Sequence, residues 1–553
     1  MAFAPPSLSA LAPADHAPKF PQRVVVEAGP WNTLDDSQDV THAKPNVARV
    51  MQNVIPIDAG SIISRPGIVK CGAVAPGTIQ AHFQLTTPTG TEITGRITNG
   101  VIQTLDWSGP TWTTVVTAAN FATAVITIST TARFACVNFN GKLLAHDGVN
   151  KPWLWDGTSG AGGLTAITAA SVWYGVPAVK DARVFAIQST ARNTFEFSAV
   201  NDATTGYVAS SLTWSFGQVD ATPLTALLAL NDALIVFRAR SCQAVVGKVT
   251  ATWSTDGTRA GLSQTIGTSS PWSVTERNGE VWFVDSDGRP QVLSAQQGPS
   301  GTVISVGPDA APMWHRLREG LRTTTRTLVA MAAQHGIAYI PFDVILLSNT
   351  TSSDTNPGRW FVIDPTRKEP VATWIGVEIM APAMVKNGTN VPTLLFGGGK
   401  PASAADGFSY YYATDIILGP WDDAFNAGPV AVVAQVEPTV LATDQSVEVN
   451  WDTLHTTVRT FTDQHTSVAI KTTQTTRAGQ TVAIVGGAFI LGTSLLGTGV
   501  LGSDPSERKW TVGIGSQGRG ITPIYTHATV GECFGLVRCR AEGTAITDQP
   551  RVR

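Results

Sequence analysis

Charged side chains are scarce in this sequence. They make up 14% of the 553 residues, whereas about a quarter of an average soluble domain is charged. With 38 Lys and Arg against 41 Asp and Glu, the net charge is only −3, which excludes a polybasic nucleic-acid binder and a disordered acidic protein. Because a monomer with so few charges would be poorly soluble, we expect much of the exterior to be buried against other subunits.

Recognisable catalytic and metal-binding motifs are also missing. No G-x-S-x-G elbow, H-E-x-x-H helix or G-x-x-x-x-G-K-[ST] loop occurs. The nine histidines are dispersed, and the five cysteines include no C-x-x-C pair that would indicate a zinc site. We expect the cysteines to be reduced, and the sequence predicts no catalytic residue, no metal site and no cofactor.

The first twenty residues lack the pattern of a secretory signal. They carry no basic segment ahead of an apolar run, and prolines interrupt them. We therefore expect the protein to be made and kept in a cytoplasm.

Glycine, proline and small polar residues take the place of charge. The 52 Gly and 33 Pro, together with abundant Thr, Ser and Ala, suit turns and pleated surfaces better than exposed helices. The clearest helical spacing lies at 45–54, where Val47, Val50, Met51 and Val54 follow Pro45-Asn46. The sequence therefore predicts a mainly β protein with few short helices.

A turn followed by a hydrophobic strand recurs along the middle of the chain. The two fullest copies begin at Asn140-Gly141 and Asn278-Gly279, and looser copies bring the starts to 140, 181, 231, 278, 335 and 393. Because propeller blades recur at about 40 to 50 residues, these six signals predict a six-bladed β-propeller. The alternative is a run of unrelated hairpins in β-sandwiches, whose turns recur every 8 to 12 residues.

Beyond residue 425 the repeat is lost and Thr/Val alternation predicts half-buried strands of an antiparallel sandwich or barrel. Within it, residues 482–502 carry no charge and repeat a Leu-Gly pair every five residues. The segment would be either a hairpin buried within an oligomeric tube or a loop that contacts a membrane. We favour burial, because a glycine-rich β segment makes a poor membrane-spanning helix. Its candidate residues are Leu491, Gly492, Leu496, Gly497, Leu501 and Gly502.

Some propellers are glycosidases that use paired carboxylates, so five aspartates are candidate catalytic groups: Asp147, Asp156, Asp285, Asp287 and Asp364. Asp147, Asp156 and Asp287 each precede glycine, which is typical of a hairpin turn and favours a structural role. A glycan hydrolase would also need exposed aromatic residues such as Trp153, Trp155 or Trp282 as a sugar platform.

A family resemblance is carried by order and spacing along most of the chain. Near the N-terminus the run consists of Ala48, Met51, Asn53, Pro56 and Gly60, followed by the tight turn Arg65-Pro66-Gly67. Further segments are AHDGVNKPWLWDG at 145–157 and VGIGSQGRGITPIYTH at 512–527. Together they resemble the tail nozzle or hub proteins of short-tailed bacteriophages, known as the tail tubular protein B or tail stabilisation protein family.

The resemblance implies three parts: residues 1–70 as a segment with a short helix and the Arg-Pro-Gly turn that docks on the ring, 71–424 as the propeller, and 425–553 as a C-terminal β domain. It implies a virion protein, assembled in the host cytoplasm as a homohexamer, that extends the DNA channel below the portal and adaptor. Its partners would be the adaptor, the tail fibres, spikes or needle, and genomic DNA that passes without sequence-specific binding.

From the residues themselves, Arg65 can pair with a carboxylate or carbonyl and hold its turn against a neighbour, while Gly67 can take a positive φ. The charge that remains is expected on the outer propeller. The alternative function is a propeller glycan hydrolase or carbohydrate-binding protein acting at the host surface.

Overall fold

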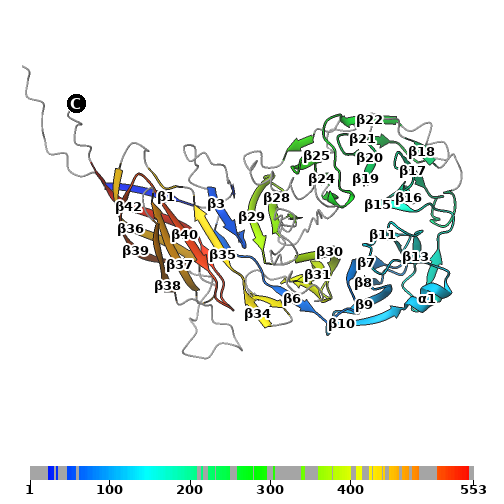
Figure 1. Ribbon diagram of the computed structural model, residues 1–553, viewed down its shortest axis with the longest axis horizontal. Helices are drawn as coiled ribbons and strands as arrows, with labels where there is room; N and C mark the ends of the chain where they lie inside the picture. Colours follow the sequence, from blue (N-terminus) through cyan, green and yellow to red (C-terminus); the bar gives the residue numbers. More distant parts are fainter. Residues whose placement is uncertain are drawn as a thin grey trace, which may run out of the picture.

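The chain is mainly β, with short antiparallel sheets arranged as a ring beside a second β domain (Figure 1). The computed structural model describes residues 23–546 with gaps, of which the longest are 35–46, 306–337, 343–358 and 485–506. The described helices are α1 (Ala118–Thr123), η3 (Ala161–Gly163) and η5 (Pro271–Ser273). No helix in these ranges is long and apolar enough to cross a membrane.

Five four-stranded sheets follow one another directly along the chain, and we number them blades 1 to 5. Blade 1 consists of β7 (Ile79–Thr86), β8 (Glu92–Thr98), β9 (Val101–Asp106) and β10 (Thr111–Val116), and blade 2 of β11 (Ala135–Phe139), β12 (Lys142–His146), β13 (Trp153–Trp155) and β14 (Leu164–Ala166). Blade 3 consists of β15 (Trp173–Lys180), β16 (Arg183–Gln188), β17 (Thr194–Phe197) and β18 (Thr213–Ser215). Blade 4 consists of β19 (Leu224–Leu230), β20 (Ala233–Arg238), β21 (Cys242–Val246) and β22 (Thr258–Ser263), and blade 5 of β23 (Val274–Arg277), β24 (Glu280–Val284), β25 (Pro290–Ser294) and β26 (Val303–Ser305).

Two further blades complete a β-propeller-like ring. Blade 6 consists of β27 (Ala338–Phe342), β28 (Arg359–Asp364) and β29 (Glu369–Ile375), and blade 7 of β30 (Glu378–Lys386), β31 (Pro392–Gly399) and β32 (Ser409–Tyr412). The fourth strand of blade 7 is β6 (Ile68–Cys71), which pairs antiparallel with β32. Because β30 also packs beside β7, an N-terminal strand closes the ring next to its first blade.

The described residues form six four-stranded sheets around the ring and, in β27–β29, a seventh blade that is continuous with the large sheet. The expected number of six blades is therefore not confirmed. The missed sheet is blade 1, whose β8–β9 turn is Asn99-Gly100 with φ of 43° and 74°. It is the same kind of turn as Asn140-Gly141 between β11 and β12, but it lies before residue 140, where the first of the six repeat signals begins. Asn-Gly suits both turns because these two residues adopt positive φ readily.

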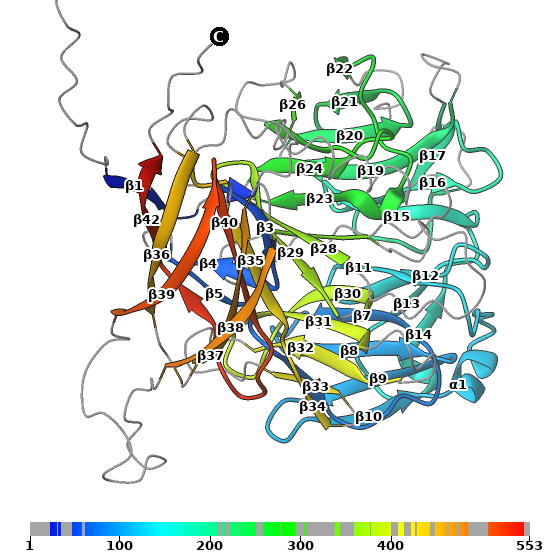
Figure 2. The same ribbon diagram turned by 60° about the vertical axis from the view of Figure 1, so that its left-hand side comes forward.

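The second β domain is built from both ends of the chain. One sheet has the order β1-β42-β36-β39, and the other continues blade 6 as β27-β28-β29-β3-β35-β40-β37-β38, with β2 paired to β3. The bounds are β1 (Arg23–Ala28), β2 (Thr33–Leu34), β3 (Val47–Gln52), β35 (Ala434–Pro438), β36 (Glu448–Arg459), β37 (Gln464–Thr472), β38 (Thr476–Ile484), β39 (Glu507–Gly518), β40 (Ile521–His527) and β42 (Arg538–Ile546). Figure 2 shows the blue N-terminal strands among the yellow, orange and red ones. Strands β1, β2 and β3, from the segment 1–70 that was expected to dock on the ring, therefore belong to the second β domain.

The expected helix at 45–54 is wrong, because this stretch forms β3 and then β4 (Val54–Pro56). β3 lies between β29 and β35 in the large sheet, and Val47, Ala48 and Met51 are buried there. The spacing that resembled one face of a helix arises because a central strand is covered on both faces. Branched side chains such as Val47 and Val50 also favour a strand.

Candidate functional site at the junction of ring and β domain

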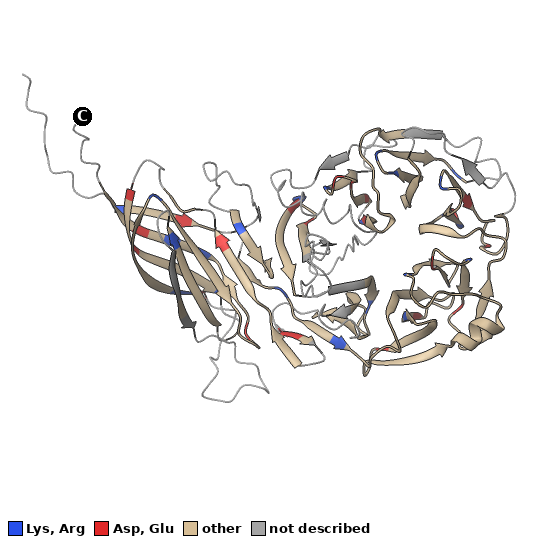
Figure 3. Cartoon of the chain, viewed as in Figure 1, with Lys and Arg blue, Asp and Glu red and all other residues tan. Residues whose placement is uncertain are grey.

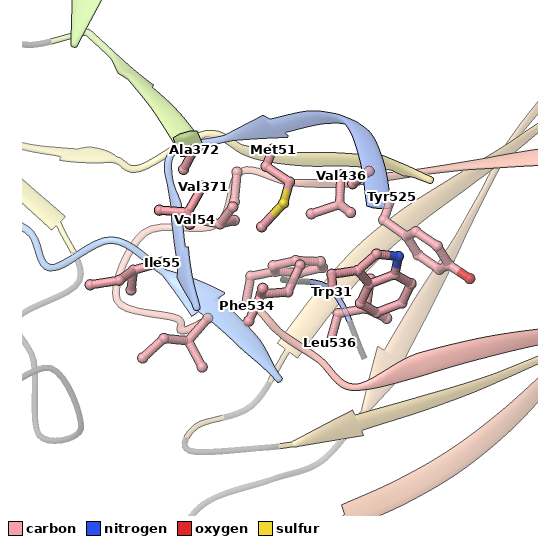
Figure 4. Close-up of a cluster of buried hydrophobic side chains, with 14 of the residues drawn as sticks. Trp31, Met51, Val54, Ile55, Val371, Ala372, Val436, Tyr525, Phe534 and Leu536 are labelled. Carbon is pink, nitrogen blue, oxygen red and sulfur yellow. The ribbon is translucent and has the colours of Figure 1, made fainter. Parts of the chain in front are cut away.

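Residues of the N-terminal run meet where the ring joins the β domain. Ala48 and Met51 are fully buried in β3, and Pro56 ends β4 half-buried. Figure 4 shows Met51, Val54 and Ile55 in a cluster with Trp31 and Phe534. This cluster is part of one hydrophobic core, which also includes Trp282, Phe396, Leu454 and Cys539 from both domains. Gly60 lies outside the described residues.

Arg65 forms a buried ion pair across the junction. Its Nη1 and Nη2 atoms donate to the two carboxylate oxygens of Asp423 at 2.8 and 2.6 Å, and Nη1 also donates to the Pro66 carbonyl at 3.1 Å. Asp423 belongs to the hairpin of β33 (Asp422–Phe425) and β34 (Gly428–Ala431), 358 residues away in sequence. Both side chains are almost fully buried, at 1% and 5% exposure.

The surroundings of Arg65 keep its guanidinium charged. Burial alone lowers the pKa of Arg65, but the charge and hydrogen bonds of Asp423 outweigh it and leave the pKa above its usual value. The guanidinium also lies 5.8 Å from the centre of the Tyr412 ring in blade 7. A planar guanidinium that binds a carboxylate through two parallel bonds fixes distance and orientation together, so the pair sets the hairpin against β6 and β32.

Asn53 connects three segments at the same place. Its backbone takes a left-handed φ of 52°, which ends β3 and redirects the chain into β4. Its side-chain Oδ1 accepts from the Ile375 backbone N–H at 2.8 Å and from Arg65 Nε at 3.2 Å, and Nδ2 donates to the Val433 carbonyl at 2.9 Å. The Asn53 side chain therefore connects blade 6, the Arg65 turn and the residue before β35 through hydrogen bonds.

Replacing Asn53 by alanine is expected to lower the free energy of unfolding by about 2 to 3 kcal/mol, since three buried hydrogen bonds are lost and alanine is disfavoured at this φ. Asn53→Gly is the matched control, because glycine accepts the φ and should be about 1 kcal/mol less damaging. Urea unfolding followed by tryptophan fluorescence measures both. Equal losses for the two variants would show that the backbone conformation contributes nothing.

Gly67 is required for a close approach and not for a positive φ. Its φ is not in the left-handed region, which corrects the sequence-based interpretation. A Cβ atom added at Gly67 would lie 2.1 Å from the Asp422 carbonyl oxygen. The Asp423 Oδ1 atom accepts from the next backbone N–H, that of Ile68, so hairpin and turn lie backbone against backbone.

A cation–aromatic contact links blade 2 to η5. The Arg133 guanidinium lies 3.7 Å from the centre of the Trp272 ring. Arg133 precedes β11 of blade 2, and Trp272 lies in η5 just before β23 of blade 5. Because η5 packs against β15 of blade 3 and β19 of blade 4, this contact connects the first strands of neighbouring blades through η5.

The aspartates weighed as catalytic groups lie in turns. Asp147 accepts from the backbone N–H groups of Ser129, Val149 and Asn150, and Asp285 from those of Asp287 and Arg289. Asp156 and Asp364 accept in the same way from residues two positions on. Trp153, Trp155 and Trp282 are at most 2% exposed, so these three indoles cannot form a sugar platform.

Charge is not confined to the outer propeller, contrary to expectation. Figure 3 shows charged positions in both the ring and the β domain. On the exposed side of the sheet β1-β42-β36-β39, Glu542 pairs with Arg23, with Arg540 Nη2 at 2.7 Å and with His455 Nε2 at 3.6 Å. The reason is that side chains of these strands alternate over part of their length between the core and solvent, and the charged ones lie on the side away from the core.

The remaining expected residues are not placed. Leu491, Gly492, Leu496, Gly497, Leu501 and Gly502 lie outside the described residues. Within the described ranges, no group of three His, Cys, Asp or Glu side chains could hold a metal ion. Sequence reasoning missed Asp422 and Asp423. The adjacent pair of acids in PWDDAF at 420–425 is a signal, but nothing local links it to Arg65.

No known family matches the sequence, and no curated protein does. Among solved structures, PorZ, a surface component of the type-IX secretion system of Porphyromonas gingivalis, is 13% identical with a TM-score of 0.32. That match covers 69% of this chain and 44%, less than half, of PorZ. An exo-β-1,3-galactanase from Phanerochaete chrysosporium is 9% identical (68% and 96% covered, TM-score 0.26), and YCF48 from Cyanidioschyzon merolae is 8% identical (63% and 98%, 0.33). Function therefore has to be argued from the residues.

Proposed function

We propose that this protein is a structural subunit of a short-tailed bacteriophage tail, a nozzle or hub ring subunit. Six copies extend the DNA channel below the portal and adaptor, retain the genome and conduct it during ejection. The observation that carries the proposal is that ring and β domain share one hydrophobic core and one continuous sheet, beside which the buried Arg65–Asp423 pair fixes the β33–β34 hairpin. A mechanical part of a channel needs such rigidity, whereas a lone binding module does not.

The shared core supports a rigid body. Domains of one chain move relative to each other by default unless their interface is large and hydrophobic. Here a single core holds Val362 and Phe396 of the ring together with Val436 and Leu454 of the β domain. In addition, the large sheet runs without a break from blade 6 through β3 into β35. Force applied to either domain would reach the other without a hinge.

The proposal includes a path for DNA between copies, along the axis of the assembly. The near balance of 38 basic and 41 acidic residues suits such a path, because a strongly basic wall would bind the phosphate backbone and slow ejection. The adaptor would lie above, and fibres, spikes or a needle would be further partners in the virion.

Electron microscopy of the purified chain tests this proposal. We expect six-fold rings with an axial opening between subunits, in which each subunit shows two lobes. The Arg65→Ala variant is expected to form fewer rings, because the β33–β34 hairpin beside the junction loses its buried partner. Isolated two-lobed particles at all concentrations would contradict the proposed assembly.

A further inference from the structure

An open cavity of about 360 Å³ lies where three blades meet. Its lining comes from β7 and β8 of blade 1, β11 and β12 of blade 2, and β30 of blade 7. We call it the three-blade cavity and define it by Gln84, Glu92, Asn138, Met384 and Lys386. Its volume falls within the range of small-molecule sites, which is about 300 to 1,000 Å³.

The polar lining is held in place by its own hydrogen bonds. Gln84 Oε1 accepts from the Lys386 backbone N–H at 2.6 Å, and Gln84 Nε2 donates to Glu92 at 2.9 Å. Asn138 Nδ2 donates to the Gln84 carbonyl at 3.0 Å. These contacts connect all three blades, so the side chains are positioned before any ligand arrives, which lowers the entropic cost of binding.

The charges of the cavity cancel. Lys386 Nζ lies 2.5 Å from Glu92 Oε1, and these two side chains stay 50% and 28% exposed. His82 and Cys136 also line the cavity. Burial lowers the pKa of His82 to about 3 and raises the pKa of Cys136 to about 12, so both side chains are neutral. A cavity without net charge offers donors and acceptors but no attraction for an ion.

The cavity also has an apolar side. Phe83, Val137, Leu143 and Met384 line it next to the amide, carboxylate and ammonium groups. A neutral ligand with hydroxyl groups on one side and C–H groups on another would complement this lining. The only carboxylate in the lining is Glu92, whereas glycoside hydrolysis generally needs two carboxyl groups about 5 to 10 Å apart.

We propose that the three-blade cavity binds a neutral mono- or disaccharide without hydrolysing it. The proposal goes beyond the tail function and does not depend on it, because the cavity is complete within one chain. It places carbohydrate binding, the alternative function considered from the sequence, in this cavity and not at the buried Trp153, Trp155 and Trp282.

Calorimetric titration with glucose, galactose, N-acetylglucosamine, lactose and maltose tests the proposal, with glucose 1-phosphate as a charged comparison. We expect saturable binding of at least one neutral sugar and weaker binding of the phosphate. Glu92→Ala should weaken binding at least tenfold. Glu280→Ala is the matched control. Glu280 forms a similar ion pair with Lys368, 2.9 Å from Nζ to Oε1, but does not line the cavity. This variant should bind the sugar as the wild type does.

Asn138→Trp provides a second variant in case Glu92→Ala does not fold, since Asn138 is exposed and a larger side chain there would fill the cavity. It should abolish binding while leaving the melting temperature unchanged. The proposal is overturned if none of the five neutral sugars binds, if binding persists in a folded Asn138→Trp variant, or if only the charged sugar binds.

Discussion

Replacing Arg65 by alanine is expected to lower the free energy of unfolding by about 3 to 5 kcal/mol, the usual consequence of removing one partner of a buried ion pair. The variant leaves the Asp423 carboxylate buried at the junction with both oxygens deprived of a guanidinium. It also removes the donor to the Pro66 carbonyl and one donor to Asn53. Urea unfolding followed by tryptophan fluorescence measures the loss.

Two matched variants make this prediction specific. Arg367→Ala removes a partly exposed arginine that pairs with Asp364 at 2.7 Å, and it should cost less than about 1 kcal/mol. The double variant Arg65→Met/Asp423→Leu removes both buried charges and should recover much of the loss, because well-packed apolar residues often replace a buried pair without penalty. If Arg65→Ala were no worse than Arg367→Ala, the pair would not stabilise the junction.

Replacing Gly67 by alanine is expected to destabilise the protein by at least about 3 kcal/mol, above the usual range for overpacking because the clash is with backbone. The new Cβ atom would meet the carbonyl oxygen, carbonyl carbon and nitrogen of Asp422 at 2.1 to 2.7 Å. The turn and the hairpin must then separate, and the Arg65–Asp423 bonds would lengthen as they do.

Gly109→Ala is the control for this variant. No heavy atom lies within 4 Å of its added Cβ, and its φ is not left-handed, so a change within about 0.5 kcal/mol is expected. Thermal unfolding of the two variants side by side gives the comparison. A Gly67→Ala protein as stable as Gly109→Ala would mean that turn and hairpin are not in backbone contact.

Local signals in the sequence predicted the local parts of the fold. The turn at Asn140-Gly141 joins β11 to β12, and the one at Asp181-Ala182 joins β15 to β16. Hairpins of this kind depend on a few adjacent residues, in which positive φ and hydrophobic alternation are visible directly. The same reasoning applied to Asn99-Gly100 would have found blade 1.

Partners far apart in sequence were not predictable in this way. Residues 47–52 pair with β35 and β29. Only this pairing shows that the spacing of their hydrophobic residues is that of a strand and not of a helix. The Arg65-Pro66-Gly67 turn was identified from its residue types, but its partner Asp423 lies 358 positions away. The adjacent acids at 422–423 are visible in the sequence, but nothing local links them to Arg65, because the pairing depends on how the β33–β34 hairpin packs beside β6.

The mass of the native particle tests the central claim most directly. One chain has a mass of 58.3 kDa, so six copies give about 350 kDa. Native mass spectrometry of the purified protein is predicted to show this hexamer as the main species, dissociating into single chains. A protein that remains at 58.3 kDa at every concentration would contradict its role as a ring subunit of a tail.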